Sequence, residues 1–154
     1  MMVSIPFIFF YLVAYLIACI FGLYFADISG FFAASANLKI ALMSSLFGGI
    51  GGVIYCLRGI YLSASVRGDW NSKWIPWYFI RPFVSTICGG VSFVFLKAGL
   101  IALEATSTGS SSDFGFFAFA LIAGLNVDKF LEKLQDIALS IWGIEKSRSS
   151  KPHE

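Results

Sequence analysis

Few residues of this sequence have the types and spacing that catalysis or metal binding requires. His153 is the only histidine, so neither a histidine-assisted nucleophile nor a histidine-rich metal site can be assembled. Cys19, Cys56 and Cys88 lie far apart inside apolar runs, which favours small core residues, with a redox or ligand role as the alternative. The sequence therefore predicts no catalytic residue, no cofactor site and no metal site, and we expect a protein that is not an enzyme.

The charged residues also restrict the possible functions. Asp27, Glu104 and Asp113 fall at the ends of apolar runs, whereas ion-coupled transport usually needs a charge near the middle of the membrane. Lys97 and Glu104 are two helical turns apart, and they would either meet lipid headgroups or line an outer vestibule. The net charge of +2 is too small to imply nucleic-acid binding, which needs several phosphate contacts.

The composition places the chain in a lipid environment. Hydrophobic residues make up 58% of the chain and charged residues 13%, with 17 Phe among the former. A domain of this size cannot hide so much apolar surface from water. The sequence therefore predicts an integral membrane protein.

Four apolar runs are candidates for transmembrane helices. The first, Ile5–Ala26, would extend about 33 Å as a helix, and no Lys or Arg precedes it as in a signal peptide, so we expect a permanent helix. The second run ends at Leu57, and the third begins after Arg81-Pro82. The fourth, from Phe114 to Val127, would reach only about 21 Å, which by itself suggests a short or re-entrant segment.

The distribution of charge favours a full crossing by the fourth run. Basic residues gather between positions 58 and 81 and again in the C-terminal region, while the two other connections carry a single base between them. The positive-inside rule places both basic regions in the cytoplasm, which requires four crossings with both termini cytoplasmic.

The chain beyond the fourth run has the pattern of an amphipathic helix. Apolar residues from Val127 to Ile141 follow helical spacing opposite a charged face, so a surface helix is predicted over 127–142. The expected fold class is an all-α membrane protein with four transmembrane helices plus a C-terminal amphipathic interfacial helix. Its organisation is a transmembrane domain over 1–143 and a disordered cytoplasmic tail over 144–154.

Aromatic and basic residues cluster in the central cytoplasmic region. All four tryptophans, Trp142 included, are expected at the cytoplasmic boundary as interfacial anchors. The alternative is a binding surface for anionic lipid headgroups or for a soluble protein. Arg81 would clamp free carbonyls at the end of the second helix or hold a lipid phosphate. The residues proposed for this interfacial contact are Arg58, Arg67, Trp70, Lys73, Trp74, Trp77 and Arg81.

Small residues recur at every fourth position on all four predicted helices, and such stripes let membrane helices approach closely. Packing within one chain is the simpler interpretation, and self-association is the alternative, with Gly48–Gly52 as its candidate surface. The positions proposed for helix packing are Ala14, Ala18, Gly22, Gly48, Gly52, Gly89 and Gly124.

The central motifs resemble those of a known group of proteins. Gly48-Gly49-Ile-Gly51-Gly52, then Trp77-Tyr78-Phe-Ile-Arg81-Pro82, and later Ala123-Gly124-Leu125, resemble an uncharacterised family of small bacterial inner-membrane proteins. That family has a Gly-Gly helix and a Trp-Tyr-x-x-Arg-Pro junction. The resemblance implies a bacterial inner-membrane location and supplies no reaction. This chain departs from the family at Tyr55, a position that the family often fills with His.

Two functions are compatible with these patterns. The first is a membrane component or adaptor, in which the cytoplasmic Trp/Arg region and the amphipathic helix form a docking face for a partner protein or lipid. The second is a homo-oligomeric ion channel or membrane-permeabilising pore built through the small-residue stripes. An enzyme of lipid chemistry is a third alternative.

Overall fold

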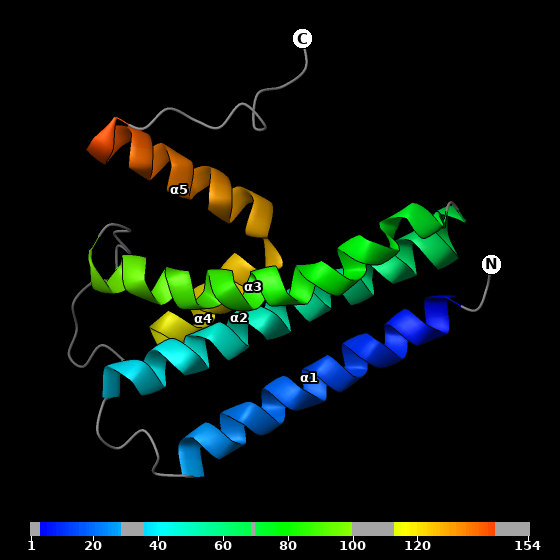
Figure 1. The fold of residues 1–154 in the computed structure, drawn as a ribbon, viewed down its shortest axis with the longest axis horizontal. Coiled ribbons are helices and arrows are strands. Elements are labelled where there is room, and N and C mark those ends of the chain that lie inside the picture. Colours follow the sequence, from blue (N-terminus) through cyan, green and yellow to red (C-terminus); the bar gives the residue numbers. More distant parts are fainter. Residues whose placement is uncertain (1–3, 29–35, 69, 100–112, 144–154) are drawn as a thin grey trace.

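A computed structural model of the chain describes residues 4–28, 36–68, 70–99 and 113–143. These ranges are helical, with no strand among them. Three long helices run side by side along the long axis of the molecule (Figure 1): α1 (Ser4–Ile28), α2 (Ala36–Tyr61) and α3 (Ile75–Lys97). Two shorter helices follow, α4 (Phe114–Leu125) and α5 (Val127–Trp142). The tail 144–154, Glu104 and the loop 106–112 lie outside the described residues.

The three long helices have the length and composition of membrane spans. The stretches that qualify are Ile5–Ile28, Ala36–Arg67 and Ile75–Lys97. Their outer faces carry large apolar side chains, among them Phe10, Phe21 and Ile87, which are 70%, 67% and 65% exposed. Such a surface is stable only against lipid or another protein. The expected all-α, multi-pass membrane protein is thus confirmed.

The fourth segment is a helix, but it is not a straight crossing. With 12 residues, α4 extends only about 18 Å. It has the length of a span only together with α5, and the two helices are bent by 107° where they meet. The described helices therefore amount to three spans, or to four if this bent pair counts as one. In Figure 1, α4 ends beside the middle of α2, and α5 leaves from that point.

Small residues bring α2, α3 and α4 into backbone contact. A Cβ atom added to Gly48 would lie 2.5 Å from the carbonyl oxygen of Ser85 and 2.7 Å from the Cα of Gly89, and one added to Gly124 would collide with the backbone of Gly48. The hydroxyl of Ser85 also donates a hydrogen bond to the carbonyl of Gly124, at 3.1 Å. We call this contact the glycine seam, and its members are Gly48, Gly52, Ser85, Gly89 and Gly124.

The small residues on α1 do not all face the other helices. A Cβ on Gly22 would meet Leu46 of α2 at 3.2 Å, whereas Ala14 and Ala18 are exposed on the outer face of α1. The helix is instead held by larger side chains. Tyr11 donates a hydrogen bond to the carbonyl of Phe79 at 3.1 Å, and Ile8 and Leu12 are fully buried in the core. Most of the predicted packing positions thus lie at contacts within the chain, and two of them face outward.

Candidate binding site at the tryptophan-rich end

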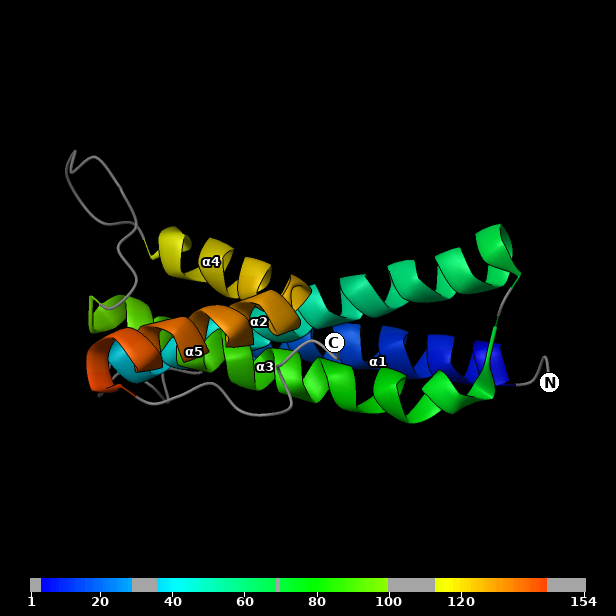
Figure 2. The same cartoon turned by 90° about the horizontal axis from the view of Figure 1, so that it is seen from above.

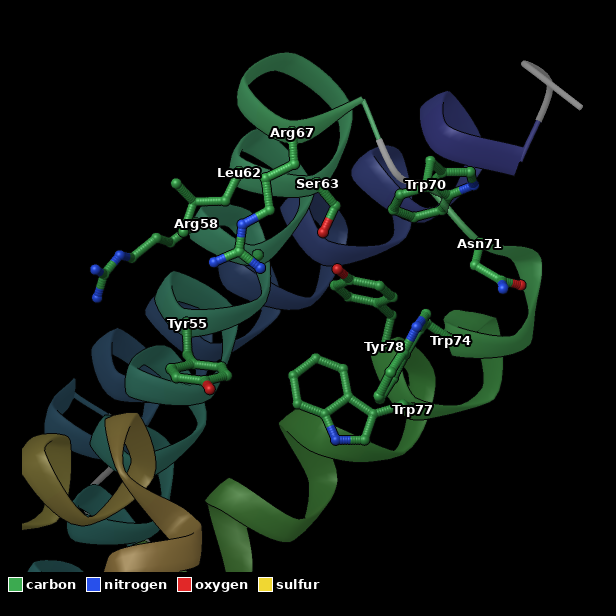
Figure 3. A pocket seen from close by; sticks show the side chains of 11 residues that line it. Tyr55, Arg58, Leu62, Ser63, Arg67, Trp70, Asn71, Trp74, Trp77 and Tyr78 are labelled. Carbon is green, nitrogen blue, oxygen red and sulfur yellow. The ribbon is translucent and has the colours of Figure 1, made fainter.

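A pocket of about 460 Å³ opens between the last turns of α2 and the first turns of α3 (Figure 3). It lies at the end of the bundle where α1 begins (Figure 1). Its wall combines aromatic rings with two arginines and small polar groups. We call it the aromatic pocket, and its lining residues are Tyr55, Arg58, Gly59, Leu62, Ser63, Arg67, Trp70, Asn71, Trp74, Trp77 and Tyr78.

The local sequence explains how the chain turns around this pocket. After Tyr61, α2 continues as a π-helical turn, η1 (Leu62–Arg67), which ends at Gly68. Gly68 has φ +67°, a left-handed conformation that favours glycine. A short 3₁₀ turn, η2 (Ser72–Trp74), then leads into α3, where Pro76 stands in the first turn, a position suited to proline.

Ring contacts hold the returning chain against α3. Trp70 stacks on Tyr78 with ring centroids 5.5 Å apart, and Trp77 packs edge-on against Tyr78 at 5.1 Å. The side chain of Asn71 accepts a hydrogen bond from the backbone N–H of Lys73 at 3.0 Å. The pocket is therefore bounded by rings that contact each other.

The charge of the pocket is positive. Arg67 points into it, whereas Arg58 extends outward from its rim (Figure 3). The other polar lining residues are neutral, and none of the described lining residues is acidic. Guanidinium groups bind phosphate and carboxylate oxygens with directed hydrogen bonds, so this end of the molecule suits an anionic group attached to an apolar or planar body.

Behind the pocket wall lies Arg81, which is only 5% exposed. Its guanidinium carbon is 4.7 Å from the ring centroid of Tyr55 and 5.2 Å from that of Trp77. Its Nη1 donates hydrogen bonds to both carboxylate oxygens of Asp128, at 3.1 and 2.9 Å. Its Nε and Nη2 are buried, and neither has a hydrogen-bond partner among the described residues.

The partner that Arg81 has in the structure is a side chain, not the backbone carbonyls of the clamp interpretation. Arg81 was expected to clamp backbone carbonyls or to hold a lipid phosphate, and in the structure it holds a carboxylate of α5. Asp128 was not singled out, because it lies on the charged face of a predicted surface helix, where solvent exposure is the ordinary outcome. Its side chain is indeed 76% exposed, so the sequence around Asp128 does not indicate an ion pair with Arg81.

The structure brings most of the predicted interfacial residues together. Arg58, Arg67, Trp70, Trp74 and Trp77 all line the aromatic pocket. Lys73 is exposed and is not part of the lining, while Arg81 lies deeper, behind the wall. The polar lining residues Ser63 and Asn71 were missed, since isolated Ser and Asn in a connecting segment are usually solvated turn residues.

The amphipathic helix does not continue this site. Figure 2 shows α5 running from the middle of the bundle toward the end at which α3 finishes, away from the aromatic pocket. The end of α5 that carries Trp142 is therefore remote from Trp70, Trp74 and Trp77. The Trp/Arg region and this helix, which were expected to share one docking face, therefore lie apart in the structure, since α5 runs away from the aromatic pocket after the 107° bend that follows α4 (Figure 2).

The motif Trp77-Tyr78-x-x-Arg81-Pro82 forms the α3 side of the site. Within the ranges that the structure describes, no group of three or more His, Cys, Asp or Glu side chains could hold a metal ion. Cys19, Cys56 and Cys88 are buried as free thiols.

Comparisons with protein-family models, with curated proteins and with solved structures found no match to this chain.

Proposed function

We propose that the protein is a non-enzymatic component of the bacterial inner membrane that docks an anionic lipid headgroup in its aromatic pocket. One observation carries this proposal: Arg58 and Arg67 share a pocket with three tryptophans at the end of spanning helices. Indole rings favour the membrane–water boundary, where one edge stays apolar and the N–H stays wet. A headgroup phosphate at that depth would meet the guanidinium groups.

The proposed orientation follows from the same residues. The basic connection between α2 and α3 supports a cytoplasmic location for the pocket, and the beginning of α1 lies at that end (Figure 1). We therefore propose a cytoplasmic N-terminus. A cytoplasmic C-terminus would require α4 and α5 together to cross the membrane, and the return of α5 toward the end at which α3 finishes (Figure 2) does not support that crossing. The resemblance of the glycine-rich and Trp-Tyr-x-x-Arg-Pro motifs to small bacterial inner-membrane proteins supports that membrane.

Native mass spectrometry of the protein in detergent tests the proposal. Wild-type protein is expected to retain phosphatidylglycerol in preference to phosphatidylcholine. The double variant Arg58→Ala/Arg67→Ala should lose most of this preference, since each arginine near a phosphate contributes about 1 kcal/mol, roughly fivefold in affinity per residue.

The matched control is Lys97→Ala, which removes an exposed positive charge at the other end of α3. It should retain phosphatidylglycerol as the wild type does. Equal retention of both lipids by the wild type, or an unchanged preference in the double variant, would overturn the proposal. A protein retained at this surface in place of lipid would instead indicate an adaptor with a protein partner.

The bent α4–α5 pair favours a second candidate, a homo-oligomeric channel. If this pair lies within the bilayer, the charges of Asp128, Lys129 and Lys133 must face protein or water, because lipid cannot solvate them. An assembly of several chains would provide such surroundings around a central path. Single-channel recording in planar bilayers tests this candidate, since reproducible unitary conductance supports it and silence from a confirmed oligomer contradicts it.

A further inference from the structure

A continuous chain of contacts links the aromatic pocket to α5. Tyr55 and Trp77 line the pocket and also flank the guanidinium of Arg81. That guanidinium binds Asp128, the second residue of α5. Arg81 therefore touches the pocket wall on one side and the beginning of α5 on the other.

Asp128 satisfies only part of the hydrogen-bonding capacity of Arg81. Both carboxylate oxygens accept from the single nitrogen Nη1, so the N–H groups on Nε and Nη2 remain unpartnered among the described residues although they are buried. Buried donors without acceptors are unfavourable. Nε and Nη2 form one edge of the guanidinium, and Asp128 does not contact this edge. A phosphate group, with three oxygens and a geometry that fits the guanidinium fork, would accept hydrogen bonds from both nitrogens.

The buried residues of α5 lie in its first turn. Val127 and Phe130 are 2% and 7% exposed and belong to a core cluster with Cys88 and Ala123. Beyond Leu134, which packs at the margin of that cluster, the large apolar residues Leu139, Ile141 and Trp142 are 44% to 60% exposed. The Arg81–Asp128 pair thus stands at the point where α5 joins the bundle.

From this arrangement we infer that Arg81 is the inner phosphate-binding residue of the aromatic pocket and that Asp128 is its displaceable counter-ion. The inference rests on the proposed docking of an anionic lipid headgroup. The phosphate reaches the unpartnered nitrogens of Arg81 when the rings of Tyr55 and Trp77, which pack against the guanidinium, move aside. It then competes with Asp128 for the same positive charge. Lipid binding therefore weakens the attachment of α5, and by linkage a weaker attachment strengthens lipid binding.

The variant Asp128→Asn tests the sign of this coupling. The amide keeps a hydrogen-bond acceptor for Nη1 but removes the competing negative charge, so retention of short-chain phosphatidic acid by native mass spectrometry should rise about fivefold, the equivalent of about 1 kcal/mol. Glu132→Gln is the matched control, because Glu132 is an exposed acid on the same helix that pairs with Lys129. It should leave retention within twofold of the wild type.

The position of α5 supplies a second, independent measurement. Spin labels at Ser140 on α5 and Val94 on α3, both exposed, report the distance between these helices by pulsed electron paramagnetic resonance. Phosphatidic acid should broaden or shift the wild-type distance distribution, and Asp128→Asn should shift it without lipid. Phosphatidylcholine and inorganic phosphate should leave it unchanged, and an equal effect of inorganic phosphate would overturn the assignment to a lipid.

Arg81→Lys keeps the charge without the fork and should reduce retention of phosphatidic acid even where the protein remains folded. Retention that is equal in Asp128→Asn and Glu132→Gln, together with a fixed position of α5, would overturn the inference while leaving the docking proposal intact. Unchanged lipid preference in Arg58→Ala/Arg67→Ala would overturn the docking proposal itself, whatever α5 does.

Discussion

Helices α2 and α3 meet in two different ways along their length. At the glycine seam their backbones touch, since Gly48 faces Gly89 and Gly52 faces Ser85. Toward the other end, Tyr55, Trp77 and Tyr78 occupy the space between the same helices, and a pocket opens. The size of the intervening side chains thus differs between the two regions: small residues stand where the backbones touch, and large rings stand where the pocket opens.

The two regions also differ in what stabilises them. Lipid tails are as apolar as leucine, so helices in a bilayer gain stability mainly from close van der Waals contact, which the seam provides. The aromatic pocket provides ring contacts and charges, which are adaptable and leave space for a ligand. Substitutions in the seam should therefore affect folding, whereas substitutions at the pocket should affect binding more than folding.

The largest expected effect is that of Gly124→Ala in the seam. The new methyl group would collide with the backbone of Gly48, which cannot move as a side-chain end can. Overpacking of this kind costs about 3 kcal/mol, so thermal unfolding in detergent, followed by circular dichroism, should shift to clearly lower temperature. Gly115→Ala on the same helix is the control, because nothing lies within 4 Å of a Cβ there. Equal melting of both variants would contradict the importance of the seam.

An intermediate effect is expected for Arg81→Ala, since Arg81 lies between the seam and the pocket on α3. The variant loses the contacts of the guanidinium with Tyr55 and Trp77 as well as the attachment of α5. Partly desolvated cation–π contacts are worth about 2 kcal/mol together, so the melting temperature should fall less than for Gly124→Ala. A melting curve like that of the wild type, with altered lipid retention, would assign Arg81 to binding alone.

Much of the fold was predictable because it depends on local patterns. Long apolar runs predicted the three spans, and helical spacing predicted a helix over 127–142, the bounds that α5 has in the structure. The small residues at Gly48, Gly89 and Gly124 indicated where helices would approach closely. Each of these signals acts within one segment, so it needs no knowledge of the neighbouring helices.

The rest depends on contacts between distant segments. Arg81 and Asp128 are 47 residues apart, and the residues around each of them do not indicate that the two side chains form a pair. The two helices α4 and α5 meet at Asn126 with a bend of 107°, and the local sequence there does not define the direction in which α5 leaves. The pocket likewise required the reversal at Gly68, which brings Trp70 back onto Tyr78.

The smallest expected effect is that of Gly59→Ala, which tests the comparison within a single helix. Gly59 lies in α2 as Gly48 does, but it faces the aromatic pocket. A Cβ there would lie 3.2 Å from the hydroxyl oxygen of Tyr78, the far end of a side chain that can shift by a few tenths of an ångström. The gain in helix propensity, about 1 kcal/mol in an ordinary helix, offsets this contact, so the melting temperature should change little.

The same variant should nevertheless alter the pocket. A methyl group at position 59 should shift the Tyr78 ring, which stacks on Trp70, and so change the tryptophan fluorescence and the retention of anionic lipid measured by native mass spectrometry. In Gly48→Ala the new Cβ would lie 2.5 Å and 2.7 Å from backbone atoms of α3, so this variant should lower the melting temperature. If the two alanine variants destabilise the protein equally, then helix separation is not set by the size of the residues between α2 and α3.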